Sequence, residues 1–164
     1  LLYNYYFKNI KSKKILHFAP EKTLHIVSQM GMNTHYSTTD LNMNNMDYPR
    51  EDIQSLSFKD SSFDITLCNH VLEHVKNDAK ALKELSRITK KNGFSIITIP
   101  IDWKSKKTII QNPKYHNGHF RHYGFDVVPL MEKFFENITI INLSKLSHED
   151  NAIKKTEIAF ICKK

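Results

Sequence analysis

Short apolar runs alternate with amphipathic segments over most of the chain, and this alternation is typical of a parallel β-sheet covered by helices. The run KILHFA opens the pattern, and GFSIITIP is the most continuous apolar stretch. We therefore predict strands at 14–19, 33–41, 62–72 and 93–100, with a weaker one at 51–56.

The strongest helix prediction covers residues 77–93, where apolar side chains recur at helical spacing on one face. Asn77 or Asp78 is the expected N-cap, and Asn92-Gly93 is the expected end of the helix. Shorter helices are predicted at 21–31 and 127–135.

The last third of the chain departs from this rhythm. Residues 101–126 show no sustained period and many polar groups, so we predict a long loop, and long loops in compact domains usually carry function. Two further strands are predicted at 137–146 and 156–164, joined by a polar linker. We expect them to form an antiparallel pair at the end of the sheet.

Length and composition agree with one enzyme-sized domain of 164 residues. The chain begins with Leu1, so residues 1–12 fit the remnant of a longer N-terminal region. No apolar run approaches the roughly 20 residues of a membrane span, and no signal peptide is recognisable, so we expect a cytoplasmic protein with no membrane partner. Cys68 and Cys162 lie inside predicted strands, without metal-type spacing, and are interpreted as buried reduced thiols.

The net charge of +7 and the isoelectric point near 9.3 raise the alternative of a nucleic-acid partner. The lysines are dispersed in short groups without interleaved aromatic residues, which favours a solvated basic surface.

The segment KKILHFAPEKTL, residues 13–24, has the layout of the first strand, loop and helix of a nucleotide-binding domain, but it contains no glycine. Glycine is what lets backbone amides approach a pyrophosphate closely. A nicotinamide-dinucleotide cofactor is therefore not expected.

Several segments together resemble the class I S-adenosylmethionine-dependent methyltransferases. They are KILHFAPE, TTDL, LSFKDSSFDITLCNHVLEHV, ALKELSRITKKNGFSIITIP and GHFRHYG, and they are most similar to a bacterial group of that family. The resemblance implies a Rossmann-like α/β fold in which a seven-stranded, mostly parallel sheet has the order 3-2-1-4-5-7-6 and strand 7 is antiparallel. It further implies a single domain over 1–164, S-adenosyl-L-methionine as cofactor, and a small-molecule acceptor such as a sugar or surface-polysaccharide precursor.

Within this resemblance, the first loop passes beneath the cofactor, and Glu21 either faces the cofactor's ammonium or caps the following helix. Asp40 ends the second strand, where a carboxylate can accept hydrogen bonds from both ribose hydroxyls. Asp52 and Ile53 take the position that grips adenine, and the end of the fourth strand lines the methionine moiety. The predicted cofactor contacts are His17, Phe18, Ala19, Pro20, Glu21, Asp40, Leu41, Asp52, Ile53, Asn69 and His70.

On the acceptor side, His119, Arg121 and Tyr123 alternate and would point the same way in an extended segment. Arg121 is suited to an anionic or sugar-like acceptor, and a histidine to its proton. Alternatively, these three side chains serve only to hold their own loop in place through hydrogen bonds. Trp103 either lines the same cavity or closes the core. The predicted catalytic residues are His74, His119, Arg121 and Tyr123.

His70, Glu73 and His74 share one face of a helical turn and, with His119, offer nitrogen and oxygen ligands to a metal. Because a capping glutamate and a packed histidine explain the same residues, we expect no metal.

The predicted reaction is methyl transfer from S-adenosylmethionine by in-line displacement. Two alternatives stay open: a non-catalytic binding or scaffolding member of the fold, favoured by the glycine-free loop, and an RNA methyltransferase, favoured by the charge.

Overall fold

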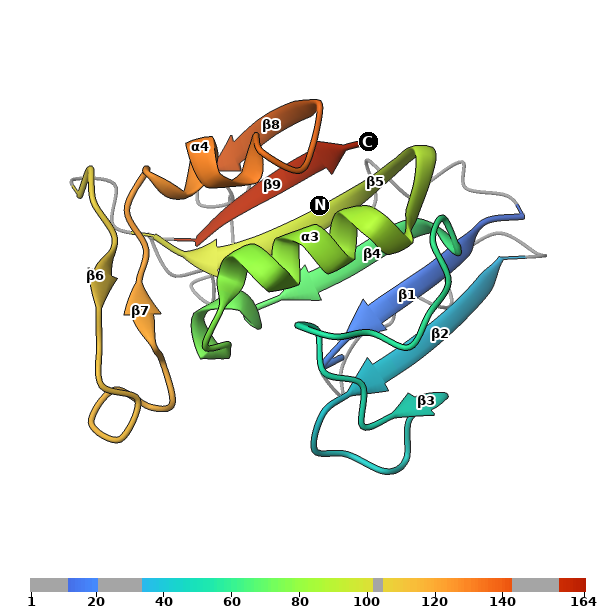
Figure 1. The fold of residues 1–164 in the computed structure, drawn as a ribbon, viewed down its shortest axis with the longest axis horizontal. Helices are drawn as coiled ribbons and strands as arrows, with labels where there is room; N and C mark the ends of the chain where they lie inside the picture. Colours follow the sequence, from blue (N-terminus) through green and yellow to red (C-terminus); the bar gives the residue numbers. More distant parts are fainter. Residues whose placement is uncertain (1–11, 21–33, 102–104, 143–156) are drawn as a thin grey trace, which may run out of the picture.

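One seven-stranded sheet organises the computed structural model, which describes residues 12–20, 34–101, 105–142 and 157–164 (Figure 1). Its strands follow the order β3-β2-β1-β4-β5-β9-β8. They are β1 (Lys14–Phe18), β2 (His35–Asp40), β3 (Tyr48–Pro49), β4 (Phe63–Asn69), β5 (Thr89–Pro100), β8 (Asn137–Asn142) and β9 (Glu157–Lys163).

The sheet is parallel from β3 to β5. The last strand, β9, then runs antiparallel to both of its neighbours, β5 and β8. When only the strands of this sheet are counted, the order is 3-2-1-4-5-7-6 with an antiparallel seventh strand. The predicted fold is confirmed.

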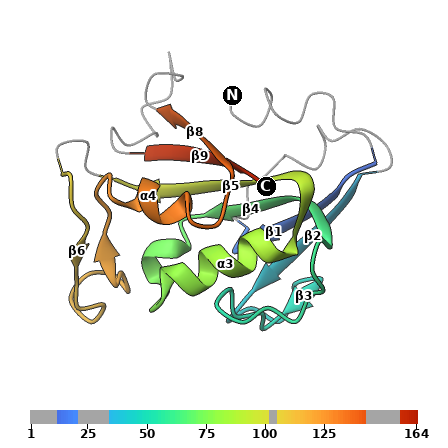
Figure 2. The ribbon, with the colours of Figure 1, turned by 45° about the horizontal axis from the view of Figure 1, so that its top comes forward.

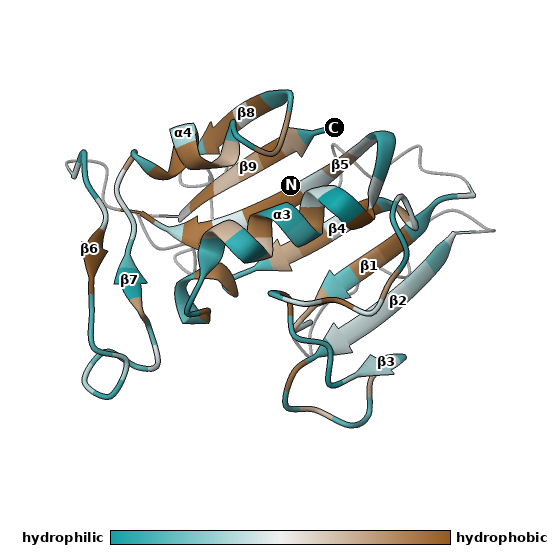
Figure 3. Cartoon of the chain, viewed as in Figure 1, coloured by the Kyte–Doolittle hydropathy of each residue, from teal (hydrophilic) through white to brown (hydrophobic). Residues whose placement is uncertain are grey.

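The buried strands are apolar along nearly their whole length, because both faces of a covered parallel sheet lie in the interior. Figure 3 shows hydrophobic colouring on β1, β4 and β9. In β4 the buried positions are Phe63 and the run from Ile65 to Cys68. Cys68 and Cys162 are free, buried thiols, as predicted.

The helix α3 (Asp78–Ile88) packs on one face of this sheet, together with the short helix α4 (Val127–Met131) (Figures 1 and 2). The Asn77 side chain caps α3 by accepting a hydrogen bond from the Lys80 backbone N–H at 3.0 Å. Burial of the apolar stripe fixes the helix on the sheet, and its members Ala81, Leu82, Leu85 and Ile88 are fully buried.

The helix predicted at 127–135 is shorter in the structure, where α4 ends at Met131. Three further predicted elements differ from the structure. The helix α3 ends at Ile88 and not at Asn92-Gly93, because Thr89 already begins β5 and its hydroxyl donates to the Leu85 carbonyl at 2.6 Å. The third strand is β3, just before the predicted range of 51–56, where the structure has only an isolated bridge between Asp52 and Ser55.

The third difference lies in the predicted long loop, which contains a two-stranded antiparallel ladder of β6 (Ile109–Ile110) and β7 (Arg121–His122). This ladder extends beyond the end of β5, beside the sheet (Figure 1). The predicted helix at 21–31, Glu21 and Trp103 lie outside the described residues. No helix in the described ranges combines the length and apolar character that crossing a bilayer requires.

Candidate cofactor pocket and an adjoining glutamate–histidine cluster

A cavity of about 540 Å³ opens at the carboxyl ends of β1, β2 and β4. This is where open α/β sheets bind ligands, and the volume suits a small organic molecule. Seven of the predicted cofactor residues line it: Phe18, Ala19, Asp40, Leu41, Asp52, Ile53 and His70.

The turns after β1 and β4 both use a left-handed backbone at a residue other than glycine. Ala19 has a φ of 47° and His70 a φ of 50°. The Ala19 N–H donates to the Thr39 carbonyl at 2.8 Å, which holds the first turn against β2. Each such residue costs about 1–2 kcal/mol relative to an ordinary backbone. The loop therefore makes the sharp turn without the glycine that usually permits it.

Asp40 ends β2 at the cavity wall. Its Oδ1 accepts hydrogen bonds from the backbone N–H groups of Asn42 and Met43, at 2.6 and 3.0 Å. Among the described residues, no donor contacts Oδ2. One oxygen thus fixes the turn while the other remains for a ligand hydroxyl.

Asp52 and Ile53 form a second part of the wall. The Asp52 carboxylate accepts from the backbone and side chain of Gln54, at 2.8 and 3.1 Å, and Ile53 is buried. The segment is held to α3, since the Glu84 carboxylate accepts from the Leu56 N–H at 2.8 Å. An apolar side chain beside a carboxylate is a suitable surface for adenine and its amino group.

His17 and Asn69 lie beneath the cavity and do not line it. Tyr36 Oη is 2.7 Å from His17 Nδ1, and Asn69 Nδ2 is 3.3 Å from His17 Nε2. Thr98 donates to the other end of the Asn69 amide at 3.2 Å. Burial lowers the pKa of His17 to about 4, so the ring is neutral at physiological pH. These side chains position β1 and β4 under the cavity.

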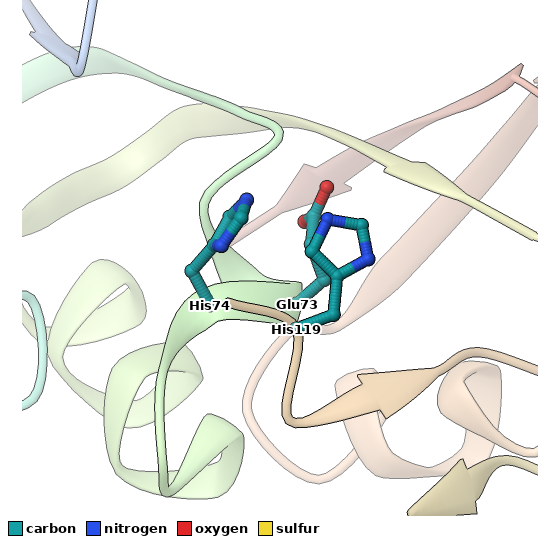
Figure 4. A group of neighbouring side chains, drawn as sticks. All are labelled: Glu73, His74 and His119. Carbon is teal, nitrogen blue, oxygen red and sulfur yellow. The ribbon is translucent and has the colours of Figure 1, made fainter. Parts of the chain in front are cut away.

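The 3₁₀ turn η1 (Leu72–His74) brings a cluster of ionisable side chains to the other side of the cavity. Ligand atoms of Glu73, His74 and His119 all lie within 4.8 Å of one another, and Figure 4 shows the three side chains projecting to the same side of the turn. His74 itself lines the cavity. Partial burial, and then the neighbouring His74, lower the pKa of His119.

Arg121 and Tyr123 lie in the interior and not at the cavity. The Arg121 guanidinium donates to the carbonyls of Leu72, Val75 and Lys76 at 2.8–2.9 Å. Tyr123 is 1% exposed, and burial, reinforced by the nearby Asp78 charge, raises its pKa far above the usual range. The two side chains do point the same way, but this geometry favours the alternative of a loop tied down by its own hydrogen bonds.

The sequence prediction missed several cavity residues. Phe120 lies between His119 and Arg121, and its N–H donates to the Glu73 carbonyl at 2.8 Å. The alternation that placed Arg121 on one side of this segment also places Phe120 on the other, so that signal was present. Of the predicted residues, Pro20 does not line the cavity; the lining residues that were missed are Thr39, Asn42, Glu51, Gln54, Val71, Val75, Lys76 and Phe120.

Comparisons with known proteins point to one family. Residues 21–97 match the methyltransferase domain family. A segment of 47 residues is 51% identical to an uncharacterised protein of Methanocaldococcus jannaschii, covering 29% of this chain and 20% of that protein. The chain therefore spans about a fifth of the length of this curated relative.

Solved structures share the fold over nearly the whole chain. A S-adenosylmethionine-dependent methyltransferase from Archaeoglobus fulgidus has a TM-score of 0.67 at 15% identity, covering 99% of this chain and 90% of that one. Phosphoethanolamine N-methyltransferase 2 of Haemonchus contortus, in complex with S-adenosyl-L-methionine, has a TM-score of 0.65 at 16% identity, covering 86% of this chain and 37% of that one. The cyclase SpnF has a TM-score of 0.66 at 11% identity, covering 99% of this chain and 79% of that one.

Together, residues 21–97 match a methyltransferase domain, and the chain shares its seven-stranded sheet with solved S-adenosylmethionine-dependent methyltransferases.

Proposed function

We propose that this chain binds S-adenosylmethionine in the cavity at the carboxyl ends of β1, β2 and β4, and transfers its methyl group to a small, hydroxyl-bearing acceptor such as a sugar. The observation that carries the proposal is the pairing of Asp40 and Asp52 on one wall with Ala19 and His70 at the two sharp turns. These four residues come from separate parts of the chain and meet at one small-molecule cavity.

The residues present fit the cofactor. Asp40 offers Oδ2 to the ribose hydroxyls, and Asp52 with Ile53 offers a carboxylate and an apolar surface to the adenine. The glycine-free first loop is no obstacle, because this cofactor has no pyrophosphate to cradle. Pro20 and Glu21 are further contacts that we propose for its amino-acid end.

The bound cofactor supplies a methyl group already activated on a sulfonium. The protein's contribution is to align the acceptor oxygen with that methyl and to exclude water, because positioning accounts for much of the barrier reduction in such a transfer. His70 and His74 line the cavity, and His119 lies against His74 with ring centroids 4.5 Å apart. We assign His74 and His119 to the acceptor side and keep His70 as a cofactor contact, while Arg121 and Tyr123 hold the segment that carries His119.

Calorimetric titration with S-adenosylhomocysteine tests the cofactor assignment. We expect micromolar affinity, equivalent to about −8 kcal/mol. Asp40→Asn should weaken binding about tenfold or more, because it keeps the Oδ1 acceptor that fixes the turn and removes the charged acceptor on Oδ2. Glu132→Ala, which removes an exposed carboxylate just after α4, is the charge-matched control and should bind normally.

Absence of binding by the native protein would refute the proposal, and equal affinity of Asp40→Asn would remove Asp40 from the ribose site. Transfer of a labelled methyl group to a panel of sugars, with RNA as a separate arm, then distinguishes the acceptor classes. Binding without transfer to any acceptor would favour the non-catalytic alternative.

A further inference from the structure

Glu73 is an unusual residue in this interior. Its side chain is 1% exposed, and Oε2 is a buried oxygen without a hydrogen-bond partner among the described residues. The other oxygen, Oε1, lies 3.3 Å from His70 Nδ1. A buried carboxylate oxygen without a donor is costly, so its place beside two further imidazoles calls for an explanation.

The surrounding backbone holds those imidazoles in place. The hydrogen bond from the Phe120 N–H to the Glu73 carbonyl ties the segment carrying His119 to η1. Gly118, with a φ of 80°, brings that segment so close that an added Cβ would lie 3.2 Å from His74 Nδ1. Two segments more than forty residues apart thus converge on one point, held by a backbone hydrogen bond and by the close approach of Gly118 to the His74 ring.

The distances between the ligand atoms of Glu73, His74 and His119 suit a single cation bound by all three. Ligand atoms bound to one ion at about 2.0–2.2 Å lie up to about 4.4 Å apart. The three ligand atoms lie within 4.8 Å of one another, so a side-chain shift of a fraction of an ångström closes the set. One carboxylate and two imidazoles are ligands for first-row divalent transition ions, and three protein ligands leave positions for water or substrate.

We propose that Glu73, His74 and His119 bind one divalent transition-metal ion at the edge of the cavity, with His70 orienting the Glu73 carboxylate from the second coordination sphere. This reverses the expectation from sequence that the residues only cap and pack. Because His74 also lines the cavity, an ion held there would be within reach of an acceptor and could bind its hydroxyl or a pair of adjacent hydroxyls. That role rests on the proposed function, whereas metal binding itself does not.

The test uses untagged protein freed of metal by a chelator and then titrated with Zn²⁺, and with Co²⁺ as a spectroscopic probe. We expect one equivalent per chain and a Co²⁺ absorption spectrum with imidazole ligation. His119→Ala should weaken Zn²⁺ binding at least about a hundredfold, since loss of even an orienting partner costs 10–100-fold. This side chain is partly exposed, so its loss leaves the fold intact.

Glu73→Gln keeps the size of the side chain and should also abolish stoichiometric binding. The matched control is His116→Ala, an exposed histidine of the same segment that is not part of the cluster, and it should bind Zn²⁺ as the native protein does. Absence of saturable binding, or equal loss in His116→Ala, would overturn the proposal. Because the titrations contain neither cofactor nor acceptor, failure here is distinct from failure to bind S-adenosylhomocysteine.

Discussion

His17 shows how one buried side chain makes stability depend on pH. The ring is fully buried, and Tyr36 and Asn69 lie at its two nitrogens. Its pKa is about 4 in the folded protein against 6.5 for an exposed histidine. Between these values the unfolded chain binds the proton and the folded chain does not, so stability rises with pH across that window.

We therefore predict that His17 contributes stability that is complete above pH 6.5 and is lost as the pH falls toward 4. The loss amounts to about 3 kcal/mol by linkage. Denaturant unfolding at pH 7 and pH 4.5 measures it, and His17→Gln should reduce the difference between the two pH values. The control His35→Gln, at an exposed position of β2, should keep the difference. An equal pH dependence in native protein and His17→Gln would contradict this account.

Residue identity and strand position predicted many of the residues that line the cavity. They did not predict which way every side chain points. Asp40, Asp52 and His70 follow strands or turns whose ends meet at one edge, so their convergence could be inferred from the sequence. His17 could not be placed in the same way, because alternation along β1 says which residues share a face but not which face carries the ligand. Alanine is common in ordinary loops, so its residue type gives no sign of the left-handed φ that Ala19 adopts in the structure.

At the scale of elements, Arg121 fastens β7 to the turn that carries the histidine cluster. Its guanidinium reaches three carbonyls of the segment from Leu72 to Lys76, and its Nε lies 3.3 Å from an Asp78 carboxylate oxygen at the start of α3. All these contacts are buried or partly buried. Removing the guanidinium takes this donor from the carbonyls of Val75 and Lys76 in the interior, whereas Leu72 and Asp78 still accept from the Tyr123 hydroxyl.

We predict that Arg121→Met lowers the free energy of unfolding by about 3 kcal/mol, as expected for breaking a buried, hydrogen-bonded ion pair. Arg50→Met, at an exposed arginine, should change it by less than about 0.5 kcal/mol. Thermal and denaturant unfolding provide the measurement. Unchanged stability combined with loss of methyl transfer would instead restore the predicted contact between Arg121 and the acceptor.

The elements predicted correctly are those whose burial gives the sequence a strong, regular pattern of apolar residues. The strands β1 and β4 and the second half of β5 are largely apolar runs, and α3 repeats its apolar stripe over three turns. By contrast, β3 consists of two exposed residues, and Ile109 and Ile110 of β6 are 58% and 76% exposed. Such short elements depend on pairing with distant residues and leave no local pattern to detect.

At the scale of the whole molecule, the two free thiols report on the opening of the sheet. Cys68 lies in β4 and Cys162 in β9, and both side chains are fully buried. Burial raises the pKa of Cys68 well above the ordinary value and that of Cys162 to about 12. Neither is a reactive thiolate while the sheet is intact.

We predict that an alkylating reagent at pH 8 modifies both cysteines at one common rate, with the denaturant dependence of global unfolding, because the sheet opens as a single unit. Mass spectrometry of the peptides separates the two sites, and fully denatured protein gives the intrinsic rates. Earlier modification of Cys162, at a rate independent of denaturant, would mean that β8 and β9 open on their own.

The place of β9 between β5 and β8 also has a consequence for the order in which the protein can assemble during synthesis. Among the described strands of this sheet, β9 comes last in the chain, yet both ladders on that side depend on it. Until residues 157–163 have been made, β5 presents an unpaired edge that includes the buried Ile96, Ile97 and Ile99. An open apolar edge of this kind pairs readily with other chains. We therefore expect nascent chains that stop short of β9 to be prone to such pairing until this strand inserts between β5 and β8.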